Sequence, residues 1–174
     1  MFAGGCFWSV EAVFEHVRGV TDAVSGFSGA SLKAGDYVRP FRGTTGYAET
    51  VKVTYDSTKV SYETLLRVFF TVAHDPTEVD RQGPDEGAEY RSVIFFVTDT
   101  QRRAALAYID TLEKTKSLKA PVATQVAPFR SFRVAPEEHQ NFVVKNPTSA
   151  YVVNYDLPKL EHFRHEMPAL FREH

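Results

Sequence analysis

The only cysteine of the 174-residue chain, Cys6, follows a glycine pair and precedes two aromatic residues, in the run Gly4-Gly5-Cys6-Phe7-Trp8. The glycines allow a tight backbone approach where a strand turns into a helix, and the N–H groups at a helix N-terminus favour the thiolate, the reactive form of cysteine. This pattern indicates a primed nucleophile. A lone cysteine beside aromatic residues is also typical of a small buried apolar side chain. Phe7 and Trp8 are accordingly either core residues or an apolar wall beside the sulfur.

The cysteine count limits the redox chemistry that the chain can perform alone. One cysteine cannot form an internal disulfide, so the chain has neither a disulfide scaffold nor an intramolecular dithiol relay. Any redox reaction at Cys6 therefore needs a thiol from another molecule. A metal site is not expected, because the single cysteine and six scattered histidines show no recurring ligand spacing.

Composition favours one soluble domain covering residues 1–174. The 20 basic and 22 acidic residues give a net charge of −2, and no Lys/Arg run suggests a nucleic-acid partner. No stretch approaches about 18 uninterrupted apolar residues, so we expect no membrane span, and the N-terminus lacks the features of a signal peptide. From these patterns we expect a cytoplasmic monomer.

The elements that would position Cys6 are readable in the periodicity of the apolar residues. Val10, Val13, Phe14 and Val17 recur at helical spacing, which predicts an amphipathic helix that begins at or just after Cys6 and is ended by Gly19. Strands are predicted at about 20–27 and 49–55, the second half-buried because apolar and polar residues alternate along it.

The remaining elements complete an α+β pattern. Ser61 is expected to cap a helix, residues 92–97 to form a buried strand, Asp99 to cap a further helix, and residues 122–126 to form a last strand. We expect the third helix to turn four apolar residues inward: Ala105, Leu106, Ile109 and Leu112. Pro136 suits the first turn of another helix. The order of these predicted strands and helices along the chain predicts an α+β two-layer sandwich with a ferredoxin-like mixed sheet core. The two long connections, at about 28–48 and 74–89, suggest function.

The run Gly5-Cys6-Phe7-Trp8 followed by Glu11 resembles the signature of the A-type peptide methionine sulfoxide reductases. The resemblance continues in order along the chain to about Gln140. Its further segments are Gly26-Phe27-Ser28-Gly29, Gly43-Thr44-Thr45-Gly46-Tyr47-Ala48-Glu49, His74-Asp75-Pro76-Thr77, Arg81 to Gly87, Tyr90-Arg91-Ser92, and Glu137 with His139-Gln140. It implies an enzyme that reduces methionine-S-sulfoxide, free or in proteins, and so repairs oxidative damage.

The resemblance also implies roles for individual residues. Thiolate attack on a sulfoxide needs proton donors at the oxygen, where negative charge develops. The family pattern gives Glu49 as the acid, and we expect burial to raise its pKa so that it stays protonated. The same pattern gives Tyr37 and Tyr90 as hydroxyl donors. In this comparison Asp85 holds the polar side of the pocket, while Phe7 and Trp8 bind the methyl group of the substrate.

Three departures from the family pattern were found. Phe41 replaces a cysteine that is common after the first tyrosine, Tyr47 replaces a common histidine, and residues 143–174 lack the resolving cysteines that many members carry. Cys6 should therefore end turnover as a sulfenic acid that an external thiol reduces. Thioredoxin, glutathione with glutaredoxin, or a smaller thiol remain possible reductants, and no other cofactor is expected. The tail is expected to pack on the domain.

Two other functions fit parts of the sequence. His74 or His139 could act as the base of a Cys-His hydrolase or acyltransferase. A peptide-binding module with a structural Cys6 is the other alternative, and the presence of Glu49, Tyr37 and Tyr90 weakens it.

Overall fold

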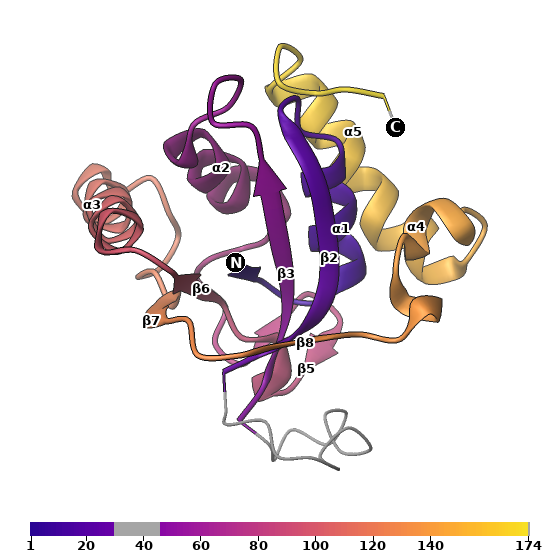
Figure 1. Cartoon of the computed structure of the whole chain (residues 1–174), viewed down its shortest axis with the longest axis horizontal. Coiled ribbons are helices and arrows are strands. Elements are labelled where there is room, and N and C mark those ends of the chain that lie inside the picture. The colour runs from indigo at the N-terminus through magenta and orange to yellow at the C-terminus, as the bar shows by residue number, and fades with distance from the viewer. Residues whose placement is uncertain (30–45, 174) are drawn as a thin grey trace.

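The protein is represented by a computed structural model that describes residues 1–29 and 46–173. Within these residues the main sheet has six strands in the order β7-β6-β1-β3-β2-β8 (Figure 1). Its strands are β1 (Phe2–Ala3), β2 (Val20–Ser28), β3 (Ala48–Tyr55), β6 (Val93–Phe96), β7 (Gln125–Pro128) and β8 (Phe132–Val134).

The central four strands form the predicted ferredoxin-like core. Strands β6, β1, β3 and β2 are neighbours in that sequence, and every pair among them is antiparallel. Strand β7 joins β6 in parallel, which makes the sheet mixed, and β8 pairs antiparallel with β2 at the other edge. The predicted α+β class is therefore confirmed.

Helices pack on this sheet and on one another. They are α1 (Phe7–Glu15), α2 (Tyr62–Val68), α3 (Asp99–Thr115), α4 (Phe142–Lys145) and α5 (Leu157–Glu166). Shorter helical turns are η3 (Phe69–Ala73), η4 (Ala88–Tyr90), η5 (Glu137–His139) and η6 (Val152–Asp156). Helix α1 contacts β2 and β3 on one side and α4, α5 and η6 on the other, so nearly all of its side chains are buried. This sandwiching holds the start of α1 firmly in place.

Local signals place α2 correctly but misplace two features of α3. The Ser61 side chain caps α2 by accepting a hydrogen bond from the Thr64 N–H at 3.1 Å, as predicted. Thr98, not Asp99, caps α3, because its hydroxyl accepts the Gln101 N–H at 3.2 Å, while Asp99 lies in the first turn and pairs with arginines. The prediction for Leu106 is wrong, since this side chain is 44% exposed.

The last predicted strand begins three residues later than expected. Val122 donates its N–H to the Glu113 side chain at 2.5 Å, and Ala123 donates to the Pro76 carbonyl at 2.7 Å. These long-range bonds occupy the start of the predicted segment, so pairing with β6 begins at Gln125. Pro136 precedes only the short 3-10 turn η5.

The connection at 74–89 carries a hairpin that the pattern did not indicate, formed by β4 (Arg81–Gln82) and β5 (Asp85–Glu86).

The C-terminal segment contributes to the core. Val152, Leu160 and Phe163 are buried, and the chain after α5 returns to the end of α1, where the Arg172 N–H donates to the His16 carbonyl at 2.9 Å. Figure 1 shows α5 beside α1. Among the helices within the described ranges, none combines the length and apolar character that a transmembrane span requires.

Candidate active site

Cys6 lies at the junction between β1 and α1, as the N-cap residue of the helix. Gly5 has a φ of +94°, a conformation that favours glycine, and a Cβ built on it would lie 2.6 Å from Gln82 Cβ. A Cβ on Gly4 would lie 2.9 Å from His74 Cγ. Both glycines are thus required by close packing where the chain turns into α1. The turn places the sulfur against the β4–β5 hairpin.

A Gly5→Ala variant is expected to lose about 3 kcal/mol of unfolding free energy, because a positive φ is strained for alanine and the added methyl group meets Gln82. Gly83→Ala is the matched control. Its φ is +58° but nothing lies within 4 Å of the added Cβ, so the expected loss is about 1 kcal/mol. Denaturant unfolding of both variants measures the difference, and equal losses would contradict the packing argument.

Glu49 on β3 is joined to the start of α1. Its carboxylate Oε2 accepts a hydrogen bond from the Phe7 N–H at 3.0 Å, and the residue is only 5% exposed. Burial raises the pKa of Glu49 to about 8, the Phe7 N–H opposes this shift, and the charges of Asp85 and Glu89 add to it. Glu49 is therefore protonated at neutral pH, as the sequence predicts, and lies next to the residue that carries the thiol.

The expectation that the helix N-terminus would make Cys6 acidic is wrong. Burial raises the pKa of the Cys6 thiol well above its usual range, and the charges of Glu49, Asp85 and Asp156 raise it further, against a lowering by the Trp8 N–H. Cys6 is 9% exposed. In the free protein the sulfur is consequently a thiol, and ionisation has to be favoured by its surroundings. Protonation of Glu49 removes one of the opposing charges.

A cavity of about 140 Å³ opens on Cys6, and four of its nine lining residues come from the C-terminal segment. The hairpin region contributes Gln82, Gly83, Pro84 and Asp85, and the C-terminal segment contributes Tyr151, Asn154, Tyr155 and Lys159. The Tyr151 hydroxyl donates a hydrogen bond to Asp85 Oδ2, which joins the two walls. Burial is the main cause that raises the pKa of Tyr151, so its hydroxyl stays protonated.

The sequence interpretation missed these C-terminal residues. Tyr151, Asn154, Tyr155 and Lys159 recur at helical spacing and so share one helix face, which was the available signal. That face is polar and aromatic, and the segment has no cysteine that would have marked it as part of a redox site.

Of the two tyrosines expected to be hydroxyl donors, Tyr90 lies within the described residues and Tyr37 does not. Tyr90 lies on η4, and burial followed by the negative charges of Glu49, Asp85 and Cys6 raises the pKa of its hydroxyl. The Tyr90 hydroxyl is therefore protonated at neutral pH. Tyr37 lies outside the described residues.

The two aromatic residues after Cys6 are held by further rings. Phe7 is 2% exposed, and its ring lies 5.5 Å from those of Phe27 and His139. Trp8 is half-buried and stacks on Phe142 at 3.6 Å between ring centroids. Among the described residues, neither aromatic lines the 140 Å³ cavity. They follow Cys6 directly in sequence, and their rings pack against other aromatic residues.

Both candidate histidines form hydrogen bonds to groups other than Cys6. His74 is buried, with Nδ1 bonded to the Phe69 carbonyl at 3.0 Å and Nε2 to the Ser92 hydroxyl at 2.7 Å, and burial lowers its pKa to about 4. His139 Nδ1 accepts the Trp8 indole N–H at 3.2 Å, so in the neutral ring the proton is on Nε2. This disfavours a Cys-His hydrolase.

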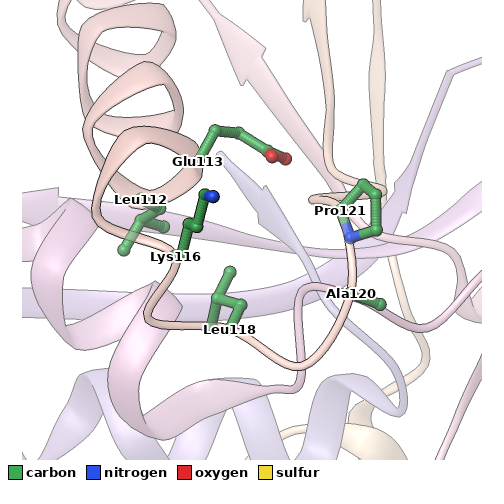
Figure 2. A pocket seen from close by; sticks show the side chains of 6 residues that line it. All are labelled: Leu112, Glu113, Lys116, Leu118, Ala120 and Pro121. Atoms are coloured by element: carbon green, nitrogen blue, oxygen red, sulfur yellow. The ribbon is translucent and has the colours of Figure 1, made fainter.

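A larger cavity of about 330 Å³ lies elsewhere, at the end of α3 (Figure 2). Its lining residues are Leu112, Glu113, Lys116, Leu118, Ala120 and Pro121. None of its described lining residues is a Cys, Ser or Thr, and Glu113 is already bonded to the Val122 N–H. Within the described part of the chain, no three His, Cys, Asp or Glu residues come together in a way that could hold a metal ion.

Comparison with known proteins gives one consistent family. The family model described as "Peptide methionine sulfoxide reductase" matches residues 1–169. The chain is 47% identical over 173 residues to "Peptide methionine sulfoxide reductase MsrA 2" of Mesorhizobium japonicum, covering 99% of this chain and 89% of the relative. The reduced form of Mxr1 from Saccharomyces cerevisiae superposes with a TM-score of 0.76 at 29% identity, covering 85% of this chain and 84% of Mxr1. Mxr1 in complex with Trx2 shares the fold, with a TM-score of 0.56 at 20% identity and coverage of 81% of each chain.

Proposed function

This chain belongs to the peptide methionine sulfoxide reductase family, and on that premise we propose how its own residues reduce methionine-S-sulfoxide, free or in oxidised proteins. The observation that carries the proposal is the arrangement around α1. A buried cysteine borders a cavity at the helix start, and the next residue's N–H binds a glutamate whose pKa is raised to about 8. The protonated acid is therefore bound to the residue that directly follows the nucleophile.

In the first step the Cys6 thiolate attacks the sulfoxide sulfur while the sulfoxide oxygen takes a proton from Glu49. The oxygen passes to the Cys6 sulfur, which is oxidised by two electrons to a sulfenic acid, and the substrate sulfur is reduced by two electrons to the thioether. Proton donation matters because negative charge develops on the oxygen. The Glu49 carboxylate regains its proton from water.

Hydroxyl groups complete the polar side of the site. Tyr90 is proposed to donate to the sulfoxide oxygen, because its raised pKa reflects burial beside Glu49, Asp85 and Cys6. Tyr37 has the same proposed role from its sequence motif. Asp85 is proposed to orient this side by accepting a hydrogen bond from the Tyr151 hydroxyl, a residue that the sequence interpretation did not include.

Phe7 and Trp8 are proposed to bind the substrate methyl group. Supporting this role, Trp8 is fixed by its stacking on Phe142 and by its hydrogen bond to His139, so its ring offers a rigid apolar face next to Cys6 in sequence. A rigid aromatic wall favours a small apolar group of fixed size, and by placing that group it selects one configuration at sulfur.

Recycling is proposed to use an external thiol. The chain has one cysteine, so a thiolate from another molecule must attack the sulfenic sulfur, releasing water and forming a mixed disulfide, which a second thiol then reduces. Thioredoxin is the proposed reductant, with glutathione and glutaredoxin as the alternative. The complex of yeast Mxr1 with Trx2 supports thioredoxin. A thiol-based supply of electrons fits the reducing cytoplasm.

The reductant is tested by measuring methionine formed from the S and R epimers with thioredoxin and its reductase, or with glutathione and glutaredoxin. We expect multiple turnovers on the S epimer with thioredoxin and none on the R epimer. Turnover with glutathione and glutaredoxin alone would assign the other reductant. Release of an acyl product from an ester, without reduction of either epimer, would contradict the proposed function.

A further inference from the structure

One cation borders the cavity at Cys6 and has no role in the mechanism above. Lys159 lies on α5, which packs against α1 (Figure 1). Lys159 lines the same cavity as Cys6. Among the described residues that line this cavity, it is the only Lys, Arg or His. The residue is half-buried, so its ammonium is only partly screened by water.

The groups around Cys6 otherwise oppose a negative sulfur. Glu49 on β3, Asp85 on β5 and Asp156 on η6 are all close enough for their charges to disfavour the thiolate. Asp156 accepts a hydrogen bond from the Ser9 hydroxyl, while its second oxygen is buried without a partner among the described residues. Tyr90 and Tyr151 are neutral donors on the same side.

Lys159 is surrounded by the same negative groups. The charges of Asp156, Cys6, Asp85 and Glu78 act on its ammonium, and all of them favour its charged form. The Lys159 charge also helps to lower the pKa of His74, which is buried and neutral at ordinary pH. Burial lowers the pKa of Lys159 despite these partners, so the ammonium is incompletely compensated in the resting site. An additional negative charge in the cavity would compensate it.

We propose that Lys159 stabilises negative charge on the Cys6 sulfur, which makes it a residue of the active site that acts by favouring the attacking thiolate. The inference deepens the proposed function, since it assumes that Cys6 is the nucleophile. It explains how a thiol that is buried among carboxylates becomes ionised: the Trp8 N–H offers one partial positive charge, and Lys159 supplies a full one within the same cavity.

The test measures the acidity of Cys6 without using catalysis. The rate of alkylation by iodoacetamide is followed against pH, because this reagent is uncharged and reacts with the only cysteine as its thiolate. Lys159→Met should raise the midpoint of the profile by about one pH unit. Lys159→Arg keeps the positive charge and should leave the midpoint close to that of the unchanged protein. Far-UV circular dichroism and thermal unfolding verify that each variant is folded.

Lys114→Met is the matched control, since it makes the same change in net charge at an exposed position on α3, where Lys114 pairs with Asp110 at 2.6 Å. It should leave the midpoint unchanged. An unchanged midpoint in folded Lys159→Met, or an equal shift in Lys114→Met, would overturn the proposal.

A reciprocal measurement covers the case in which Lys159→Met does not fold. Linkage requires the Cys6 thiolate to stabilise the Lys159 ammonium by the same free energy. Cys6→Asp carries a negative charge at this position, so the pKa of Lys159, followed by NMR of isotopically dimethylated lysines, should be higher in Cys6→Asp than in Cys6→Ser, and equal values would overturn the proposal. Both readouts are independent of turnover, so a failed Lys159 role is distinguishable from a failed reductase assignment, which would appear as an absence of methionine from the S epimer.

Discussion

A Cys6→Ser variant is expected to lose methionine-S-sulfoxide reduction by about a thousandfold or more, because a hydroxyl cannot replace the thiolate as nucleophile and oxygen acceptor. The measurement is methionine formed per enzyme with excess dithiothreitol and the purified S epimer. The fold should be retained, since serine is close in size to cysteine and the Cys6 side chain makes no cap hydrogen bond to α1.

The Cys6→Ser result also discriminates among the competing functions. A peptide-binding module with a structural cysteine would keep its affinity for an oxidised peptide and would show no reductase activity before substitution. Persistence of reduction in the folded variant would remove Cys6 from the mechanism, and with it the sulfenic acid intermediate.

Glu49→Gln is expected to lower the rate of sulfoxide reduction by about a hundredfold or more near neutral pH, because an amide binds the oxygen but cannot transfer a proton to it. In the unchanged protein, the pKa of about 8 keeps Glu49 protonated below that pH, so the rate divided by the fraction of Cys6 present as thiolate should fall as the pH rises through 8. The variant should lack that descending limb. Single-turnover rates measured across the pH range test both expectations.

Glu15→Gln is the matched control for Glu49. Glu15 is also a buried carboxyl whose pKa is raised, to about 7, but it lies at the other end of α1 from Cys6. The control should keep the wild-type rate and the descending limb near pH 8. An unchanged rate in Glu49→Gln would show that another group protonates the sulfoxide, and Tyr90 would be the first candidate.

The parts of the site that depend on short-range patterns were predictable. The glycine pair, the helix that follows Cys6 and the half-buried strand that carries Glu49 each have a local signal in residue spacing, and the structure has all of them. The ferredoxin-like sheet core also followed from the alternation of strands and helices, whereas the pairing order of the strands did not.

Features of the fold and the site that depend on residues far apart in the chain were not predictable from residue spacing. The start of β7 is set by hydrogen bonds to Glu113 and Pro76, and the C-terminal wall of the cavity exists only because η6 and α5 pack against α1. The acidity of Cys6 follows the same rule. A helix N-terminus has a fixed local effect, whereas burial and the carboxylates from three other elements come from the tertiary structure and outweigh it.

The most direct test of the central claim is a single turnover without reductant. The protein is mixed with an excess of each sulfoxide epimer, and methionine is measured together with the mass of the Cys6 peptide after trapping of sulfenic acids. The account predicts about one equivalent of methionine from the S epimer and one oxygen gained at Cys6. Methionine from the R epimer instead, or methionine from the S epimer with Cys6 still a free thiol, would contradict it.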